Sequence, residues 1–152
     1  MSLKDPHKKM SKTPHLSQGE GAGQAGDDSC LFLSDSPEVV RRKVKRAVTD
    51  SSDEIKAGEN KPALTNLLTI YCEVSGVPIK KLEAKYKGKG YGEFKTNLAE
   101  AIVEFLAPIQ KRRKELEKRK GYVEEVLAEG AKRARPIAQK TLLEVKKKMG
   151  LI

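Results

Sequence analysis

The residues best suited to chemistry lie near the N-terminus, in the string Lys9-Met10-Ser11-Lys12-Thr13. Its two lysines stand three residues apart, and two hydroxyl side chains flank the second of them. Two ammonium groups on a movable segment can neutralise a triphosphate while negative charge shifts onto a departing pyrophosphate. Basic tails also contain such strings by chance, so the string indicates a nucleoside triphosphate site only in a supporting context.

A second group of candidate residues is basic and lies in the C-terminal half of the chain. Lys and Arg number 31 against 21 Asp and Glu, a net charge of +10, which favours a polyanionic partner such as nucleic acid. The candidate phosphate-contacting residues are Lys111, Arg112, Arg113, Lys118, Arg119, Lys132, Arg133 and Arg135. Arg112 and Arg119 are seven residues apart and would share one face of a helix. The alternative is a solvated surface whose charges partly pair with Glu115 and Glu117.

Aromatic side chains for stacking on nucleic-acid bases are scarce. Tyr86, Tyr91 and Tyr122 are the candidates for exposed rings that could stack on bases. Tyr71, Phe94 and Phe105 lie on apolar faces of expected helices, so we expect these three rings in the core.

Other polar residues do not form a convincing site. His7 and His15 are eight residues apart without acidic neighbours at ligand spacing, so we expect no metal site. Asp50, Asp53 and Glu54 lie in a turn-rich stretch and fit a turn or helix cap better than a catalytic carboxylate pair.

The elements that must position these residues are helical. Residues 1–35 are expected to form a mobile arm, because residues 17–26 contain four glycines and no large apolar side chain. Residues 36–152 are expected to form a helical domain, which opens with the capping signal Ser36-Pro37-Glu38. Apolar residues then recur at helical spacing, and no strand-like alternation of useful length appears. Nor does any apolar run approach the length of a membrane span.

The predicted fold is therefore all-α. It is a bundle of about five helices, preceded by the flexible N-terminal loop. Its last two helices are long and are expected to kink at Pro108 and Pro136, since a proline inside a helix removes a backbone hydrogen bond.

Several strings in register resemble one family. The first, Lys9 to Thr13, resembles the second signature of class I aminoacyl-tRNA synthetases, and those that follow resemble the C-terminal part of the tryptophanyl-tRNA synthetase family. These later strings are Val44–Ser51 (VKRAVTDS), Pro62–Tyr71 (PALTNLLTIY), Gly88–Lys95 (GKGYGEFK), Leu106–Gln110 (LAPIQ) and Glu144–Leu151 (EVKKKMGL). They keep the family's order and about its spacing. Thr13 stands where the family usually has Ser, and residues 14–26 depart from the family's short segment.

The resemblance implies roles for these residues. Lys9 and Lys12 would be catalytic, in a loop from Lys9 to Thr13 that binds ATP and stabilises the departing pyrophosphate during tryptophan activation. The helical domain would contact the anticodon arm of tRNA. The family also implies Mg²⁺ with the ATP, a homodimeric parent enzyme, and a cytoplasmic location or an organelle such as the mitochondrion.

The same resemblance sets a limit on activity. A nucleotide-binding α/β domain with a tryptophan pocket is expected before Asp5, and this sequence shows neither its histidine motif nor its βαβ pattern. We therefore expect a C-terminal portion of a tryptophan–tRNA ligase that is inactive by itself. The alternatives are a stand-alone basic helical module that binds nucleic acid without catalysis, and an interaction protein whose amphipathic helices only dimerise.

Overall fold

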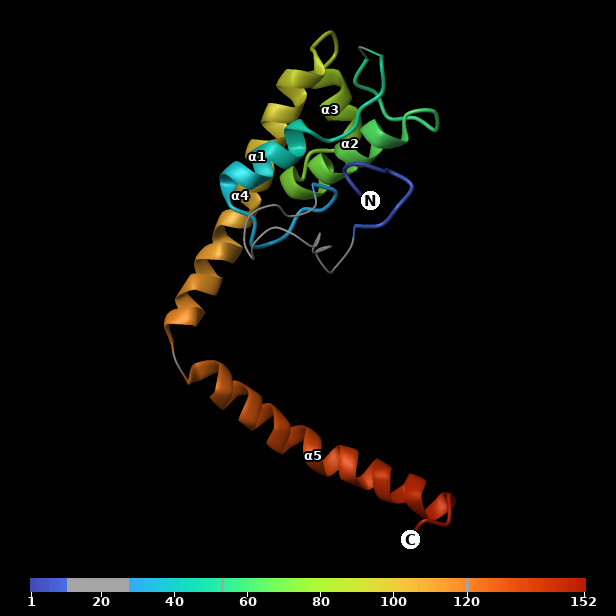
Figure 1. The fold of residues 1–152 in the computed structure, drawn as a ribbon, viewed down its shortest axis with the longest axis vertical. Coiled ribbons are helices and arrows are strands. Elements are labelled where there is room, and N and C mark those ends of the chain that lie inside the picture. Colours follow the sequence, from blue (N-terminus) through green and yellow to red (C-terminus); the bar gives the residue numbers. More distant parts are fainter. Residues whose placement is uncertain (11–27, 53, 120) are drawn as a thin grey trace, which may run out of the picture. The chain divides into compact units, whose positions relative to one another are not determined.

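The computed structural model describes residues 1–10, 28–52, 54–119 and 121–152. Within them the chain forms five α-helices and no strand, which confirms the predicted all-α class (Figure 1). The helices are α1 (Pro37–Lys45), α2 (Pro62–Ser75), α3 (Ile79–Lys85), α4 (Tyr91–Lys118) and α5 (Tyr122–Lys148). The chain divides into two compact units, Met1–Gln110 and Lys111–Ile152.

The ends of the helices follow the expected local signals. Ser36 caps α1, its hydroxyl accepting a hydrogen bond from the Val39 backbone N–H, and Pro37 occupies the first helical position. Gly76 ends α2 with a φ of 69°, a left-handed conformation that glycine adopts without steric cost. Both α4 and α5 continue through their internal prolines, Pro108 and Pro136.

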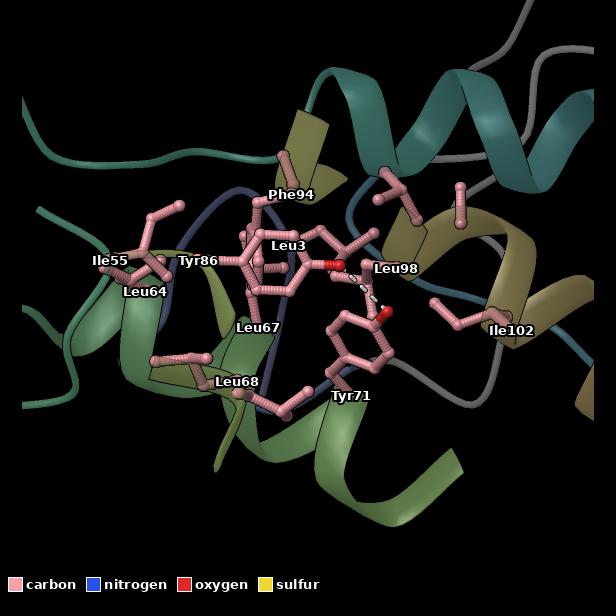
Figure 2. Close-up of a cluster of buried hydrophobic side chains, with 14 of the residues drawn as sticks. Leu3, Ile55, Leu64, Leu67, Leu68, Tyr71, Tyr86, Phe94, Leu98 and Ile102 are labelled. Carbon is pink, nitrogen blue, oxygen red and sulfur yellow. Dashed lines mark hydrogen bonds between the residues drawn. The ribbon is translucent and has the colours of Figure 1, made fainter. Parts of the chain in front are cut away.

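The core of the first unit is built by α1, α2, α3 and the first part of α4. Leucine is the most frequent of its buried side chains, and Tyr71, Tyr86 and Phe94 form an aromatic cluster (Figure 2). The ring centroids of these three residues lie 5.3–6.1 Å apart, and the hydroxyl groups of Tyr71 and Tyr86 are 3.1 Å apart. The expectation of buried Tyr71 and Phe94 is confirmed.

Two expectations for aromatic residues are wrong. Tyr86 is completely buried and so is not a stacking platform, because it follows Leu82 on the buried side of α3 and meets the hydroxyl of Tyr71. Phe105 is 46% exposed, because Leu106 takes the buried position that continues the four-residue series of Leu98 and Ile102 on α4.

Segments on both sides of residues 11–27 pack on the helices. Leu3 is buried in the core, where its backbone N–H donates to the Ser29 carbonyl and its own carbonyl accepts from Val48 N–H. Cys30 is also buried. The glycine-rich stretch from 17 to 26, on which the expectation of a mobile arm rested, lies outside the described residues.

The second unit differs in its burial. No residue of α5 is buried, and its large apolar side chains are about half exposed or more. Across the described parts of the chain, no helix combines the length and apolar character that crossing a membrane requires.

Candidate nucleic-acid interface

Most of the basic residues of α1 are held by carboxylates of the same unit. The Arg41 guanidinium donates to both oxygens of Glu100 at 2.7 and 2.9 Å. Arg46 and Arg42 lie 3.0 and 3.7 Å from the two oxygens of Asp28. One of these carboxylates, Asp28, comes from the segment before α1, and the other, Glu100, comes from α4.

Lys43 is the most deeply buried cation of α1. Its side chain is 1% exposed, and its ammonium group donates to Asp35 at 2.8 Å and lies 4.8 Å from the centre of the Phe32 ring. Asp35 also accepts from the Phe32 backbone N–H at 2.9 Å. Gln110 of α4 donates to the Leu33 and Asp35 carbonyls, so residues 32–35 are fixed on both helices.

A cavity of about 450 Å³ lies between α1 and α4. Its lining residues are Arg41, Lys45, Tyr91, Gly92, Lys95, Thr96, Ala99 and Glu100. Since Arg41 and Glu100 neutralise each other, the positive charge of the cavity comes from Lys45 and Lys95. Among the described residues, neither lysine makes an ion pair.

Lys95 is held at the end of α1. Its half-buried ammonium group donates to the Ala47 carbonyl at 2.8 Å. Desolvation by burial lowers the pKa of Lys95. Among the described residues this ammonium has no anionic partner, and a phosphate group that enters the cavity would provide one.

Tyr91, at the start of α4, is oriented by a polar network on one side of the cavity. Its hydroxyl donates to the carboxylate of Asp50, which also accepts from the Ser52 backbone N–H and hydroxyl at 3.1 and 2.9 Å. Lys61 donates to the Ser52 hydroxyl at 2.6 Å. Burial raises the pKa of Asp50, but the hydrogen bonds from Tyr91 and Ser52 outweigh it and the pKa is lowered. The observed contacts of Asp50 are those of a turn.

The cavity has the composition of a site for one nucleotide. Its volume lies within the range of small-ligand pockets, its Tyr91 ring and lysine stems offer apolar surface, and two ammonium groups can meet a phosphate. The sequence analysis selected Tyr91 but not Lys45 or Lys95. Their positions in the family-like strings VKRAVTDS and GKGYGEFK were the one available signal, because α1 and α4 come together only in the fold.

The first group of sequence-selected cations lies at the start of the second unit. Arg112 pairs with Glu115 at 3.3 Å and Arg113 with Glu117 at 2.7 Å, as the alternative of intrahelical pairing expects. All these groups are exposed, so such pairs hold the arginines only weakly. The Arg119 guanidinium lies 4.4 Å from the centre of the Tyr122 ring. Lys111 and Lys118 are exposed.

The second group, Lys132, Arg133 and Arg135, is exposed on α5. At 100° per residue these three side chains spread over roughly 160° of the helix surface, on the side away from most of its apolar residues. They therefore give α5 a broad basic side.

The string that could bind ATP is only partly described. Lys9 is exposed, and Met10 packs against the core. Ser11, Lys12 and Thr13 lie outside the described residues, as does His15. The described part of the chain brings together no three His, Cys, Asp or Glu side chains that could hold a metal ion.

Comparison with known proteins assigns the chain to a family. The family model described as tRNA synthetases class I (W and Y) matches residues 1–107. The chain belongs to this family of class I tRNA synthetases. Resemblance to the family, inferred from the sequence strings, is thereby confirmed.

Relatives within the synthetase family match the whole chain. Tryptophan–tRNA ligase of Wolinella succinogenes is 45% identical over 152 residues, which are 100% of this chain and 43% of the relative. The ligase of Bacillus subtilis is also 45% identical, over 99% of this chain and 43% of the relative. The crystal structure of tryptophanyl-tRNA synthetase from Mycoplasma pneumoniae superposes with a TM-score of 0.79 at 31% identity, covering 100% of this chain and 43% of that one. The chain thus spans less than half the length of these relatives.

Proposed function

We propose that this chain is the C-terminal portion of a tryptophan–tRNA ligase and supplies its helical tRNA-binding domain. The observation that carries the proposal is the match of all 152 residues to tryptophan–tRNA ligases at up to 45% identity. The whole ligase would activate tryptophan with ATP, transfer it to tRNA, act as a homodimer, and work in the cytoplasm or an organelle.

The cavity between α1 and α4 supports an RNA partner. Lys45 and Lys95 would contact a backbone phosphate, and the ring of Tyr91 would lie against a base. Single-stranded RNA, such as an anticodon loop, presents unstacked bases that can enter such a cavity. The exposed cations from Lys111 to Arg119, and Lys132, Arg133 and Arg135, would add phosphate contacts.

The string from Lys9 to Thr13 would serve the ATP side of the ligase. Lys9 and Lys12 would neutralise charge on the departing pyrophosphate, with Met10, Ser11 and Thr13 forming the rest of the loop. Mg²⁺ would accompany the ATP phosphates. The described residues gather no carboxylate cluster for it, so none of the steps above depends on this ion.

Binding of a tryptophan tRNA to variants of the cavity tests the proposal. Lys45→Met and Lys95→Met each remove one charge but keep a long apolar side chain, and each should weaken binding about tenfold. Lys80→Met is the matched control, since Lys80 is exposed on α3 and does not line the cavity. Equal affinity of all three variants and the unaltered chain would contradict the assignment of the cavity.

A second assay tests the limit on activity. By itself the 152-residue chain should show no tryptophan-dependent ATP–pyrophosphate exchange, because it lacks the substrate-positioning half of the site that the relatives' greater length provides. Exchange well above background would contradict the view that this chain is one part of a larger enzyme.

A further inference from the structure

The apolar face of α5 has no partner in its own unit. On a helical wheel most of its apolar residues fall on one side, within a sector of roughly 160°, and Leu143 is the large aliphatic residue outside it. We call this set the α5 stripe; it comprises Val123, Val126, Leu127, Gly130, Ala131, Ala134, Ile137, Ala138, Thr141, Leu142, Val145 and Met149. The large side chains among them are 45–73% exposed. The helix has 27 residues and is about 40 Å long. An exposed apolar stripe of this length is typical of a protein–protein contact surface.

The stripe is close to palindromic about residue 136. Ala134 and Ala138 lie two residues on either side of this centre, and Leu127 and Val145 lie nine residues away. Two copies of a helix that cross antiparallel on a twofold axis place such symmetric positions opposite each other. Alanine would then meet alanine at the crossing, and leucine would meet valine toward each end.

Apart from Ile137, small residues occupy the middle of the stripe. Gly130, Ala131, Ala134 and Ala138 leave little side-chain volume there. The distance between two packed helices depends on the side chains at their contact, so this centre permits a close approach. Pro136 lies on the opposite side of α5 by helical spacing and does not interrupt the contact.

Charges at the two ends of α5 favour the antiparallel arrangement. The first turn carries Glu124 and Glu125, and the last turn carries Lys146, Lys147 and Lys148. Symmetry about residue 136 sets Glu124 opposite Lys148, and by helical spacing both residues lie at the edges of the stripe. A parallel pair would instead set like charges side by side and align the two helix dipoles.

We propose that the α5 stripe is the docking surface for α5 of a second copy of this chain, in an antiparallel pair centred near residue 136. The inference concerns the 152-residue chain and does not depend on its proposed part in a ligase.

Sedimentation velocity over a range of protein concentrations tests the pairing. Between about 5 and 500 µM the mass should rise from 16.8 kDa towards twice that value. Ala134→Glu places a charge at the crossing and should weaken association about tenfold or more. Ala128→Glu is the matched control on the same helix, because Ala128 is exposed but lies outside the stripe. Neither position belongs to the core of the first unit, so both variants should fold.

Charge exchange tests the orientation. Glu124→Lys should weaken the pair, and so should Lys148→Glu. The chain with both changes should associate again, since the new lysine then faces the new glutamate of the other copy in the antiparallel pair only. A monomer at every concentration, equal effects of Ala134→Glu and Ala128→Glu, or failure of the double variant to recover would each overturn the proposal. A monomer would mean that another part of a longer chain, or another protein, covers the stripe.

Discussion

The ammonium group of Lys43 on α1 lies 2.8 Å from the carboxylate of Asp35, with the lysine side chain 1% exposed and the aspartate side chain 11% exposed. A buried cation depends on such a partner, because removing one member leaves an uncompensated charge away from water. The pair fastens the segment that follows residue 30 onto α1. Lys43, although basic, thus serves the fold of the first unit.

Replacing the aspartate of this pair should destabilise the first unit. Asp35→Asn removes the negative charge and should lower the free energy of unfolding by about 3–5 kcal/mol. Urea unfolding followed by tyrosine fluorescence measures the effect, since the chain has no tryptophan and three of its four tyrosines lie in this unit. Glu117→Gln, which breaks the exposed pair with Arg113, should cost less than about 1 kcal/mol. Equal costs for the two variants would contradict the account of Lys43.

The hydroxyl groups of Tyr71 and Tyr86 should behave as a coupled pair. Tyr71→Phe leaves the Tyr86 hydroxyl buried without this partner and should cost about 1–3 kcal/mol of stability, as should Tyr86→Phe. The variant with both changes removes both polar groups, so it should lose much less than the sum of the single losses. Additive losses in urea unfolding would show that the two hydroxyls do not interact.

Alkaline pH should unfold the first unit through the same tyrosine. Burial, followed by the hydrogen bond with Tyr86, raises the pKa of Tyr71 above its ordinary value of 10.0. Since the folded-state pKa is the higher one, the associated stability is complete below pH 10 and is lost as the pH rises further. Tyrosinate absorbance should show Tyr71 ionising together with unfolding. Ionisation near pH 10 in a chain that stays folded would contradict its burial.

The exposed arginines at the start of the second unit should contribute to RNA affinity without affecting stability. Arg112→Ala with Arg113→Ala should weaken binding of a tryptophan tRNA several-fold and reduce its salt dependence by roughly one to two phosphate contacts. The urea midpoint of the first unit should not change. Glu115→Gln with Glu117→Gln is the matched control, because it releases the same two arginines and should strengthen binding or leave it unchanged. Unchanged affinity in the arginine variant would exclude this face from the interface.

The sequence predicted the helical elements well because their signals are local. Ser36 and Pro37 act through their own backbone conformations, and the structure starts α1 there; Pro62 and Gly76 act in the same local way at the two ends of α2. Which side chains pack against other helices was harder to predict from the sequence. Periodicity places Phe105 and Leu106 on adjoining parts of one helix, and only the packing decides that Leu106 is the buried one.

The candidate site shows the same division. The sequence shows where the basic residues are. Whether each one is free to contact a phosphate depends on neighbours that only the fold brings together. Arg41 turns out to be bound by Glu100, 59 residues away, whereas Lys45 and Lys95 face a shared cavity. A count of charged residues cannot distinguish an arginine that a carboxylate neutralises from a lysine that faces a cavity.

The most direct test of an RNA-binding role is a titration of the 152-residue chain with a tryptophan tRNA between about 50 and 200 mM salt. Each phosphate neutralised by a lysine or arginine contributes about 0.7–0.9 to the slope of log affinity against log salt concentration. We predict a slope of about 2 or more, which falls by roughly one when Lys95→Met is introduced. A flat line, or no binding at the lowest salt concentration, would contradict the account.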